Sequence, residues 1–234
     1  GGDGRLHRRG LNLRPGRPRP AGRDRLHRRG RPYGSPEFRR RLRFLPGVLA
    51  DGVNISPLNI KVGDKIIISG TIGNHGVAVM AERNGLSFNP PVLSDTAPLN
   101  HIVQEMLGYG GVHAMRDPTR GGLATTLKEM ALESGLCFEV SEEAIPVAHG
   151  VIGASELLGL DPLYIANEGI FVAIVKNDAA EQMIDALKKN PLGRGANIIG
   201  EVVESPSGKV LLKTRIGGTR IIDMLSGEQL PRIC

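Results

Sequence analysis

The chain ends in a cysteine, Cys234, which follows Pro231, Arg232 and Ile233. Free cysteine usually sits in a core as a small apolar side chain, whereas chain ends are poorly ordered unless something holds them. A terminal thiol is therefore expected to be accessible, and its thiolate is a nucleophile. The alternative interpretation is a frayed end that happens to finish in cysteine. The chemistry of the residue alone does not separate these two interpretations.

Residues 116–122, Arg-Asp-Pro-Thr-Arg-Gly-Gly, gather groups that suit a phosphate. Asp117 could hold Mg²⁺, and Arg116 or Arg120 could bind a phosphate through two parallel N–H groups. Thr119 and the two glycines that end the motif stand where a helix is predicted to begin, and backbone N–H groups attract anions there. The alternative is a plain helix start, with Thr119 as its cap and Asp117 paired with a nearby arginine.

Two further loops could carry chemistry. Residues 70–76, Gly-Thr-Ile-Gly-Asn-His-Gly, would let a backbone approach an anion, and they place His75 beside it. The spacing fits neither the P-loop nor the dinucleotide-binding fingerprint, so an ordinary turn is the alternative. Residues 166–169, Ala-Asn-Glu-Gly, put Glu168 at the end of a predicted strand, where a carboxylate could act as an acid or base. A solvated turn is the alternative there.

Hydrophobic periodicity places these motifs between strands and helices of one domain. Strands are predicted at 65–69, 112–115, 136–140, 170–175, 198–203, 209–213 and 220–224, and helices at 77–83, 98–107, 121–133, 151–158 and 178–189. We predict that 170–175 is a central strand, that Asp178 caps the last helix, and that 205–208 forms a hairpin turn. Strands and helices of these lengths indicate an α+β fold, a layered sheet with packed helices.

Composition divides the chain into three parts. Residues 1–46 hold fifteen arginines, no lysine and three acids, whereas the remainder holds fifteen basic and twenty-one acidic residues. We predict domains at 1–46 (disordered or out of frame), 47–225 (α+β domain) and 226–234 (mobile tail ending in the cysteine). Two distant cysteines are neither a disulfide framework nor a zinc pattern, which favours a reducing cytoplasm. No apolar run is long enough to cross a membrane.

The first 46 residues allow three interpretations. An arginine-rich arm could bind nucleic acid or an acidic partner. It could equally be disordered without a role. The third interpretation is out-of-frame translation of GC-rich DNA, because Arg-Leu-His-Arg-Arg-Gly occurs twice, at 5–10 and 25–30, in a segment without lysine. On the third interpretation this segment is no guide to function.

Several segments together resemble the HypE family, the carbamoyl dehydratases of nickel–iron hydrogenase maturation. These belong to the aminoimidazole-ribonucleotide-synthetase-like ATPases. The resemblance runs from about residue 47 to the end and is carried by residues 116–122, 155–162, 166–169, 190–193, 199–203 and the terminal Pro-Arg-Ile-Cys. Because the related purine and selenophosphate synthetases need no terminal thiol, the last motif favours HypE.

The resemblance implies a mechanism. A partner transferase, HypF, carbamoylates Cys234; the tail then enters an ATP site, where phosphorylation and loss of phosphate leave a thiocyanate. Its cyano group passes to iron on the HypC–HypD scaffold. The resemblance implies Glu168 as base, Asp117 as Mg²⁺ or phosphate ligand, and ATP contacts from His75, Arg116, Thr119, Arg120, Gly121, Gly122 and Asn167. It also implies a homodimer when the family's N-terminal domain is present, and neither membrane nor nucleic-acid binding.

The sequence departs from the family at two places. Asn74 stands where the family loop usually carries Asp before His. The family's N-terminal domain, which supplies acidic Mg²⁺ ligands, a functional lysine and the dimer interface, has no counterpart in residues 1–46. We therefore expect this polypeptide to bind ATP poorly and to have impaired activity. The competing hypothesis is a non-enzymatic docking module with a basic, nucleic-acid-binding arm.

Overall fold

The structure is a computed structural model that describes residues 52–224. The segment 1–46, the tail with Cys234 and both predicted domain boundaries lie outside the described residues. The described part is built on one seven-stranded mixed sheet with the order β2-β4-β1-β5-β3-β6-β7. Its strands are β1 (Lys65–Ile68), β2 (Val112–Arg116), β3 (Cys137–Ser141), β4 (Val172–Val175), β5 (Asn197–Val203), β6 (Val210–Lys213) and β7 (Thr219–Ile222).

The strands β1 and β4 are apolar on both faces because helices cover both faces there. In β1, Ile66 and Ile68 enter one core cluster, while Ile67 between them enters the other. Successive residues of a strand point to opposite sides, so one run of three isoleucines fills two cores. The neighbouring β4 pairs antiparallel with β1 and divides its side chains in the same way. This explains why both segments lack the polar–apolar alternation of a half-exposed strand.

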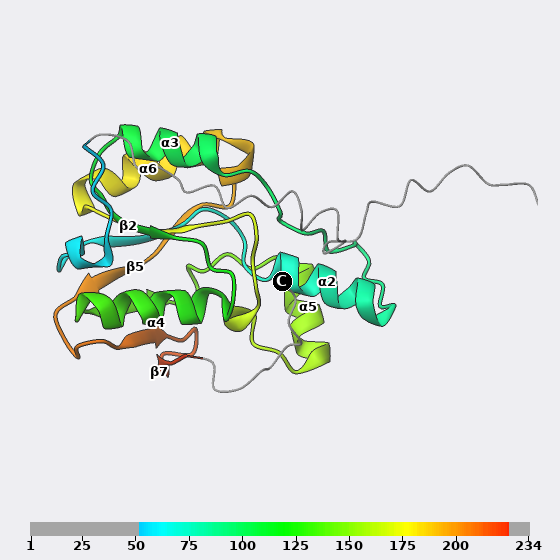
Figure 1. The fold of residues 1–234 in the computed structure, drawn as a ribbon. Coiled ribbons are helices and arrows are strands. Elements are labelled where there is room, and N and C mark those ends of the chain that lie inside the picture. The colour runs from blue at the N-terminus through cyan, green and yellow to red at the C-terminus, as the bar shows by residue number, and fades with distance from the viewer. Residues whose placement is uncertain (1–51, 225–234) are drawn as a thin grey trace, which may run out of the picture. The chain divides into compact units, whose positions relative to one another are not determined.

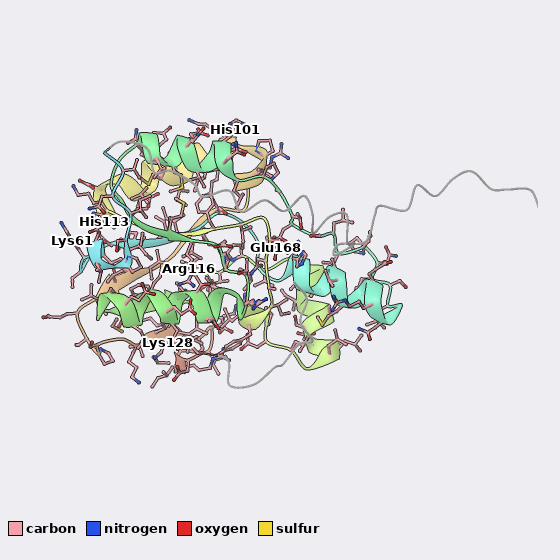
Figure 2. All side chains as sticks on the ribbon, in the orientation of Figure 1. Lys61, His101, His113, Arg116, Lys128 and Glu168 are labelled. Carbon is pink, nitrogen blue, oxygen red and sulfur yellow. The ribbon has the colours of Figure 1, made fainter. Side chains whose placement is uncertain are left out.

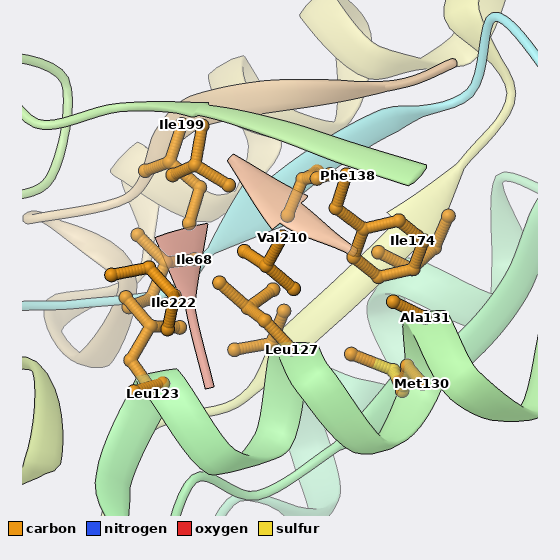
Figure 3. Packing of buried hydrophobic residues seen from close by; sticks show 14 of the residues in the cluster. Ile68, Leu123, Leu127, Met130, Ala131, Phe138, Ile174, Ile199, Val210 and Ile222 are labelled. Atoms are coloured by element: carbon orange, nitrogen blue, oxygen red, sulfur yellow. The ribbon is translucent and has the colours of Figure 1, made fainter. Parts of the chain in front are cut away.

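Helices form the layers on the two sides of the sheet, as Figure 1 shows. On one side α4 (Gly122–Ser134) packs Leu123, Leu127 and Met130 against the sheet. Figure 3 shows these side chains meeting Phe138, Val210 and other strand residues. On the other side lie α3 (Asn100–Gly108) and α6 (Asn177–Lys189). The predicted α+β class with helices packed on a sheet is confirmed.

A third, smaller cluster joins α2 (Asn74–Asn84) to α5 (His149–Leu158) beyond one end of the sheet (Figure 1). Its buried members are Val77, Met80, Val151, Ala154 and Ile165. Short 3₁₀ turns, η1 (Pro57–Asn59), η2 (Pro162–Tyr164) and η3 (Pro191–Gly193), complete the fold. Within residues 52–224, no helix is long and apolar enough to cross a membrane.

Every predicted strand and helix exists, with ends displaced by a few residues, but three details were wrong. The strand predicted as central, β4, lies second from the edge and is buried because helices cover it. Residues 205–208 do not close a hairpin, since β3 separates β5 from β6 in the sheet. Asp178 lies in the first turn of α6, and the N-cap is Lys176 without a side-chain cap.

Candidate functional site

One buried amide, that of Asn167, joins three of the loops singled out in the sequence. Its Oδ1 accepts a hydrogen bond from the backbone N–H of Gly73 at 2.6 Å. Its Nδ2 donates to the carbonyl oxygens of Pro118 and Ile165, each at 3.0 Å. Asn167 is fully buried, and both N–H donors of its amide are used. The loop before α2, the loop before α4 and the segment 165–169 are therefore held together from inside.

Glycines allow this close approach. A Cβ on Gly122 would lie 2.5 Å from the Leu163 carbonyl oxygen, and one on Gly76 would lie 2.4 Å from Cγ2 of Ile165. Both distances are shorter than a real Cβ contact allows. Gly76 also donates its backbone N–H to the carbonyl of Ala166 at 3.1 Å. These two glycines thus serve the packing of α2 and α4 against residues 163–166.

Asp95, which the sequence analysis missed, completes the site from a fourth segment. Its carboxylate accepts hydrogen bonds from the backbone N–H of Glu168, at 3.2 and 3.3 Å to its two oxygens. A Cβ on Gly169 would lie 1.6 Å from the Asp95 carbonyl oxygen, so the two backbones are in direct contact. The adjacent Ser94 bonds His75 of α2, with 3.0 Å between Oγ and Nδ1.

Burial raises the pKa of Asp95 above its ordinary value, and this effect exceeds the opposing one of the backbone hydrogen bonds and of His75. A buried carboxylate loses hydration that its hydrogen bonds only partly replace. Residues 89–99 show no helix or strand periodicity and contain three prolines, so the sequence alone does not predict which residues Asp95 contacts. The one local signal is a Ser-Asp-Thr triplet in an otherwise Pro-rich connection.

Glu168 lies among these contacts, at the end of the sheet where α2 begins (Figure 2). Its side chain is partly buried, and its backbone N–H is fixed by Asp95. The fold therefore brings the carbonyl group of Pro118 together with three predicted site residues, His75, Asn167 and Glu168. A carboxylate with a fixed backbone at a meeting point of loops is suited to accept a proton from a bound substrate.

The structure does not direct the side chains of the 116–122 motif to one common point. Arg116 makes an ion pair with Glu129 of α4, 2.7 Å from Nη2 to Oε2, so its guanidinium turns to that helix. Asp117 and Arg120 are exposed and make no hydrogen bond or ion pair with other described residues. Thr119 does not cap α4 with its side chain: the N-cap is Gly121, which has no side chain to cap with. The carbonyl of Thr119 instead accepts from Gly122 N–H at 3.1 Å.

At the start of α4, the N–H of Gly122 is bonded to Thr119, and the next two residues are left to offer N–H groups to an anion. Gly121 and Gly122 have φ of 72° and 61°, a backbone conformation that favours glycine. The first-turn amides that follow have no acceptor within the helix, and a phosphate could satisfy them. At α2, in contrast, the N–H groups of Gly73 and Gly76 are already bonded to residues 166–167. Residues 70–76 therefore have fewer free backbone N–H groups to offer an anion than their glycines alone suggest.

The donor set for Mg²⁺ is sparse. Residues 52–224 contain no group of three or more His, Cys, Asp or Glu side chains placed to hold a metal ion. Asp117 offers one exposed carboxylate, and Mg²⁺ often binds through one or two carboxylates together with the phosphates of a substrate. Asp117 thus fits a metal that arrives with a nucleotide, and does not by itself form a metal centre.

Comparison with known proteins gives a consistent result. Residues 61–213 match the family described as AIR synthase related protein, C-terminal domain. The carbamoyl dehydratase HypE of Bradyrhizobium diazoefficiens is 53% identical over 190 residues, which is 80% of this chain and 55% of that protein. The chain thus spans about half the length of the curated relatives it matches.

Two solved structures are similar in fold and sequence. A crystal structure of hydrogenase maturation protein HypE in complex with ATP has a TM-score of 0.75 and 43% identity, covering 80% of this chain and 57% of that one. A crystal structure of a HypE–HypF complex has a TM-score of 0.73 and 43% identity, covering 76% of this chain and 58% of that one. The family match over residues 61–213 includes the loops that build the site.

Proposed function

The chain belongs to the AIR synthase-related protein family, and because it is also similar to HypE we propose that it acts as a HypE-type carbamoyl dehydratase in nickel–iron hydrogenase maturation. The observation that carries this proposal is the 53% identity to a carbamoyl dehydratase HypE over four-fifths of the chain. The terminal thiol of Cys234 supplies the atom that such a reaction modifies. We propose a cytoplasmic location and the HypC–HypD iron scaffold as the acceptor of the cyano group.

The proposed reaction converts a carbamoyl group on the sulfur of Cys234 into a thiocyanate. The carbamoyl oxygen takes the γ-phosphoryl group of ATP, and ADP leaves. The nitrogen then gives up both protons while the carbon–oxygen bond breaks and inorganic phosphate departs. The sulfur–carbon bond stays, so the product is S–C≡N with no change of oxidation state. Phosphorylation makes a poor leaving oxygen a good one, and catalysis is mostly positioning and charge neutralisation.

The described residues divide these tasks. We assign the amides at the start of α4 and the side chain of Arg120 to the phosphates. Asp117 would hold Mg²⁺, which neutralises phosphate charge when it is bound with the nucleotide. Glu168 would take a proton from the carbamoyl nitrogen. We assign Asn167 a positioning role, because its amide donors are occupied by the backbone of Pro118 and Ile165.

A two-step mass measurement on the C-terminal peptide tests this function. The chain is incubated with HypF, carbamoyl phosphate and ATP, and the peptide mass is followed over time, because the same ATP serves both steps. We expect the peptide to gain one carbamoyl group on Cys234 and then to lose one water. A Cys234→Ser variant should show neither change. The alternative, a docking module, predicts an unchanged peptide mass.

The experiment should include a chimera, since the relatives are longer than this chain. In the chimera, residues 47–234 follow the N-terminal part of the Bradyrhizobium diazoefficiens relative. We propose HypF as a partner because a HypE–HypF complex has a closely similar fold. If neither the chain nor the chimera accepts a carbamoyl group, the proposed function is wrong.

A further inference from the structure

The point at which the C-terminal tail leaves the domain is tied down by side chains. Asp223 follows β7, one residue before the end of the described part. Its carbonyl oxygen accepts a hydrogen bond from the hydroxyl of Tyr164 at 3.0 Å. Its carboxylate Oδ1 lies 3.5 Å from Nζ of Lys128. Two elements distant in sequence thus hold the last residues before the tail.

Lys128 is unusual because its side chain is only 5% exposed, on a helix whose buried face is otherwise mostly apolar. Burying an ammonium group is costly unless its N–H groups find partners. Nζ donates to the carbonyl oxygen of Gly208 at 3.0 Å, in the connection between β5 and β6. With Asp223 as second partner, Lys128 links α4, this connection and the end of β7. Figure 2 places Lys128 on the side of α4 near β7.

Tyr164 connects the same point to the candidate site. It ends η2, three residues before Asn167 and four before Glu168. Next to it, Arg220 of β7 makes an ion pair with Asp161, 2.6 Å from Nη2 to Oδ2. Two contacts therefore join residues 220–223 to η2 and its N-cap, directly before the segment that carries Glu168. That segment is itself fixed from inside by the buried amide of Asn167.

We propose that Lys128, Tyr164 and Asp223 form a tail anchor, which fixes where the C-terminal tail begins relative to Glu168. The inference rests on the proposed function, in which the sulfur of Cys234 must reach the site. Ten residues, 225–234, follow the anchor's end and can span at most about 36 Å when fully extended. Holding their starting point limits the volume that the sulfur explores and raises its effective concentration at the site. The three are positioning residues, because none is assigned to substrate.

The first test measures the anchor without using the reaction. Tyr164→Phe removes only the hydroxyl, and Lys128→Met removes the charge while keeping an unbranched apolar stem. In both variants we expect faster amide hydrogen exchange at residues 219–224, with unchanged exchange in α6. Tyr109→Phe and Lys188→Met are matched controls on exposed positions of other elements. Equal exchange at 219–224 in the wild type and both variants would overturn the anchor.

The second test compares dehydration in cis and in trans. In cis, Cys234 of the same chain is carbamoylated; in trans, a carbamoylated peptide of residues 225–234 is given to a chain ending at Met224. We expect both variants to lower the single-turnover rate in cis about two- to fivefold, since a freed β7 lengthens the tether. The rate in trans should not change.

The outcomes separate the two proposals. Equal losses in cis and in trans would mean that Tyr164 acts on the segment with Glu168, and the tail anchor would be wrong. If neither the wild-type chain nor the chimera shows dehydration in either arrangement while exchange at 219–224 still responds to both variants, the proposed function fails and the contacts of the anchor stand. An unaffected rate in cis would show that the anchor does not position the sulfur.

Discussion

At the scale of single residues, Glu168 is the group from which chemistry can be tested most directly. The Glu168→Gln variant keeps the size and hydrogen-bonding capacity of the side chain but removes the base. We expect dehydration of carbamoylated Cys234 to slow by about 10²- to 10⁴-fold, the usual contribution of a positioned acid or base. Carbamoylation of the thiol by HypF should continue at the wild-type rate. A variant that dehydrates as fast as the wild type would remove Glu168 from the reaction.

Asp95 predicts a pH-dependent stability at the same scale. Its pKa is raised by burial, so the folded state binds a proton on this carboxyl more tightly than the unfolded state does. The resulting contribution to stability is present below the ordinary value near 3.8 and is lost as pH rises through the higher folded-state pKa. In the Asp95→Asn variant, the side-chain oxygen can still accept the hydrogen bond from Glu168 N–H, but the amide group does not titrate.

We therefore expect the melting temperature of Asp95→Asn to rise relative to that of the wild type as pH increases from about 4 to 7. Thermal unfolding of both proteins across this range measures the difference. The matched control is Asp185→Asn, which makes the same substitution at an exposed position of α6. A melting temperature of Asp95→Asn that falls relative to that of the wild type as pH rises would contradict the burial argument.

At the scale of elements, the site depends on close backbone contact between segments 95–97 and 166–169. Gly169→Ala would place a methyl group 1.6 Å from the Asp95 carbonyl oxygen, so the two segments must separate. We expect a loss of about 3 kcal/mol or more in the free energy of unfolding. Gly153→Ala is the control: it lies exposed in α5 with open space around it and should gain about 0.5–1 kcal/mol. Chemical denaturation measures both, and equal effects would contradict the packing account.

The elements also show what the sequence could and could not predict. The helix α4 and the strand β1 follow from local apolar spacing, which a reader of the sequence sees directly. The order β5-β3-β6 does not, because which strands pair is decided by contacts between distant segments. The motif around Asn167 was visible, but two of the three backbone partners of its amide come from loops 49 and 94 residues away. The contacts of Asp95 and Lys128 could not be predicted from the sequence, because they exist only after distant segments have packed together.

At the scale of the whole molecule, Cys137 reports on global opening. Its thiol is fully buried in β3, which lies between β5 and β6. Burial is the larger cause that raises the pKa of this thiol, and the negative charge of nearby Glu139 raises it further. Both effects oppose reaction, since the thiolate is the reactive form. We expect a maleimide to modify Cys137 only at the rate of global unfolding, whereas Cys234 should react at once. Intact-mass measurement counts the labels, and Cys137→Ala identifies the slow one. Fast double labelling under native conditions would contradict this.

The position of β1 in the sheet has a consequence for biosynthesis. Both neighbours of β1, the strands β4 and β5, come more than 100 residues later in the chain. A nascent chain therefore carries three consecutive isoleucines without a strand partner until β4 has left the ribosome, and without the second partner until β5 has left it. Such late, non-local pairing slows folding and leaves an apolar strand edge exposed in the meantime. The domain should consequently fold only after both partner strands have emerged, and it should depend on chaperones during that interval more than a protein with local strand pairing would.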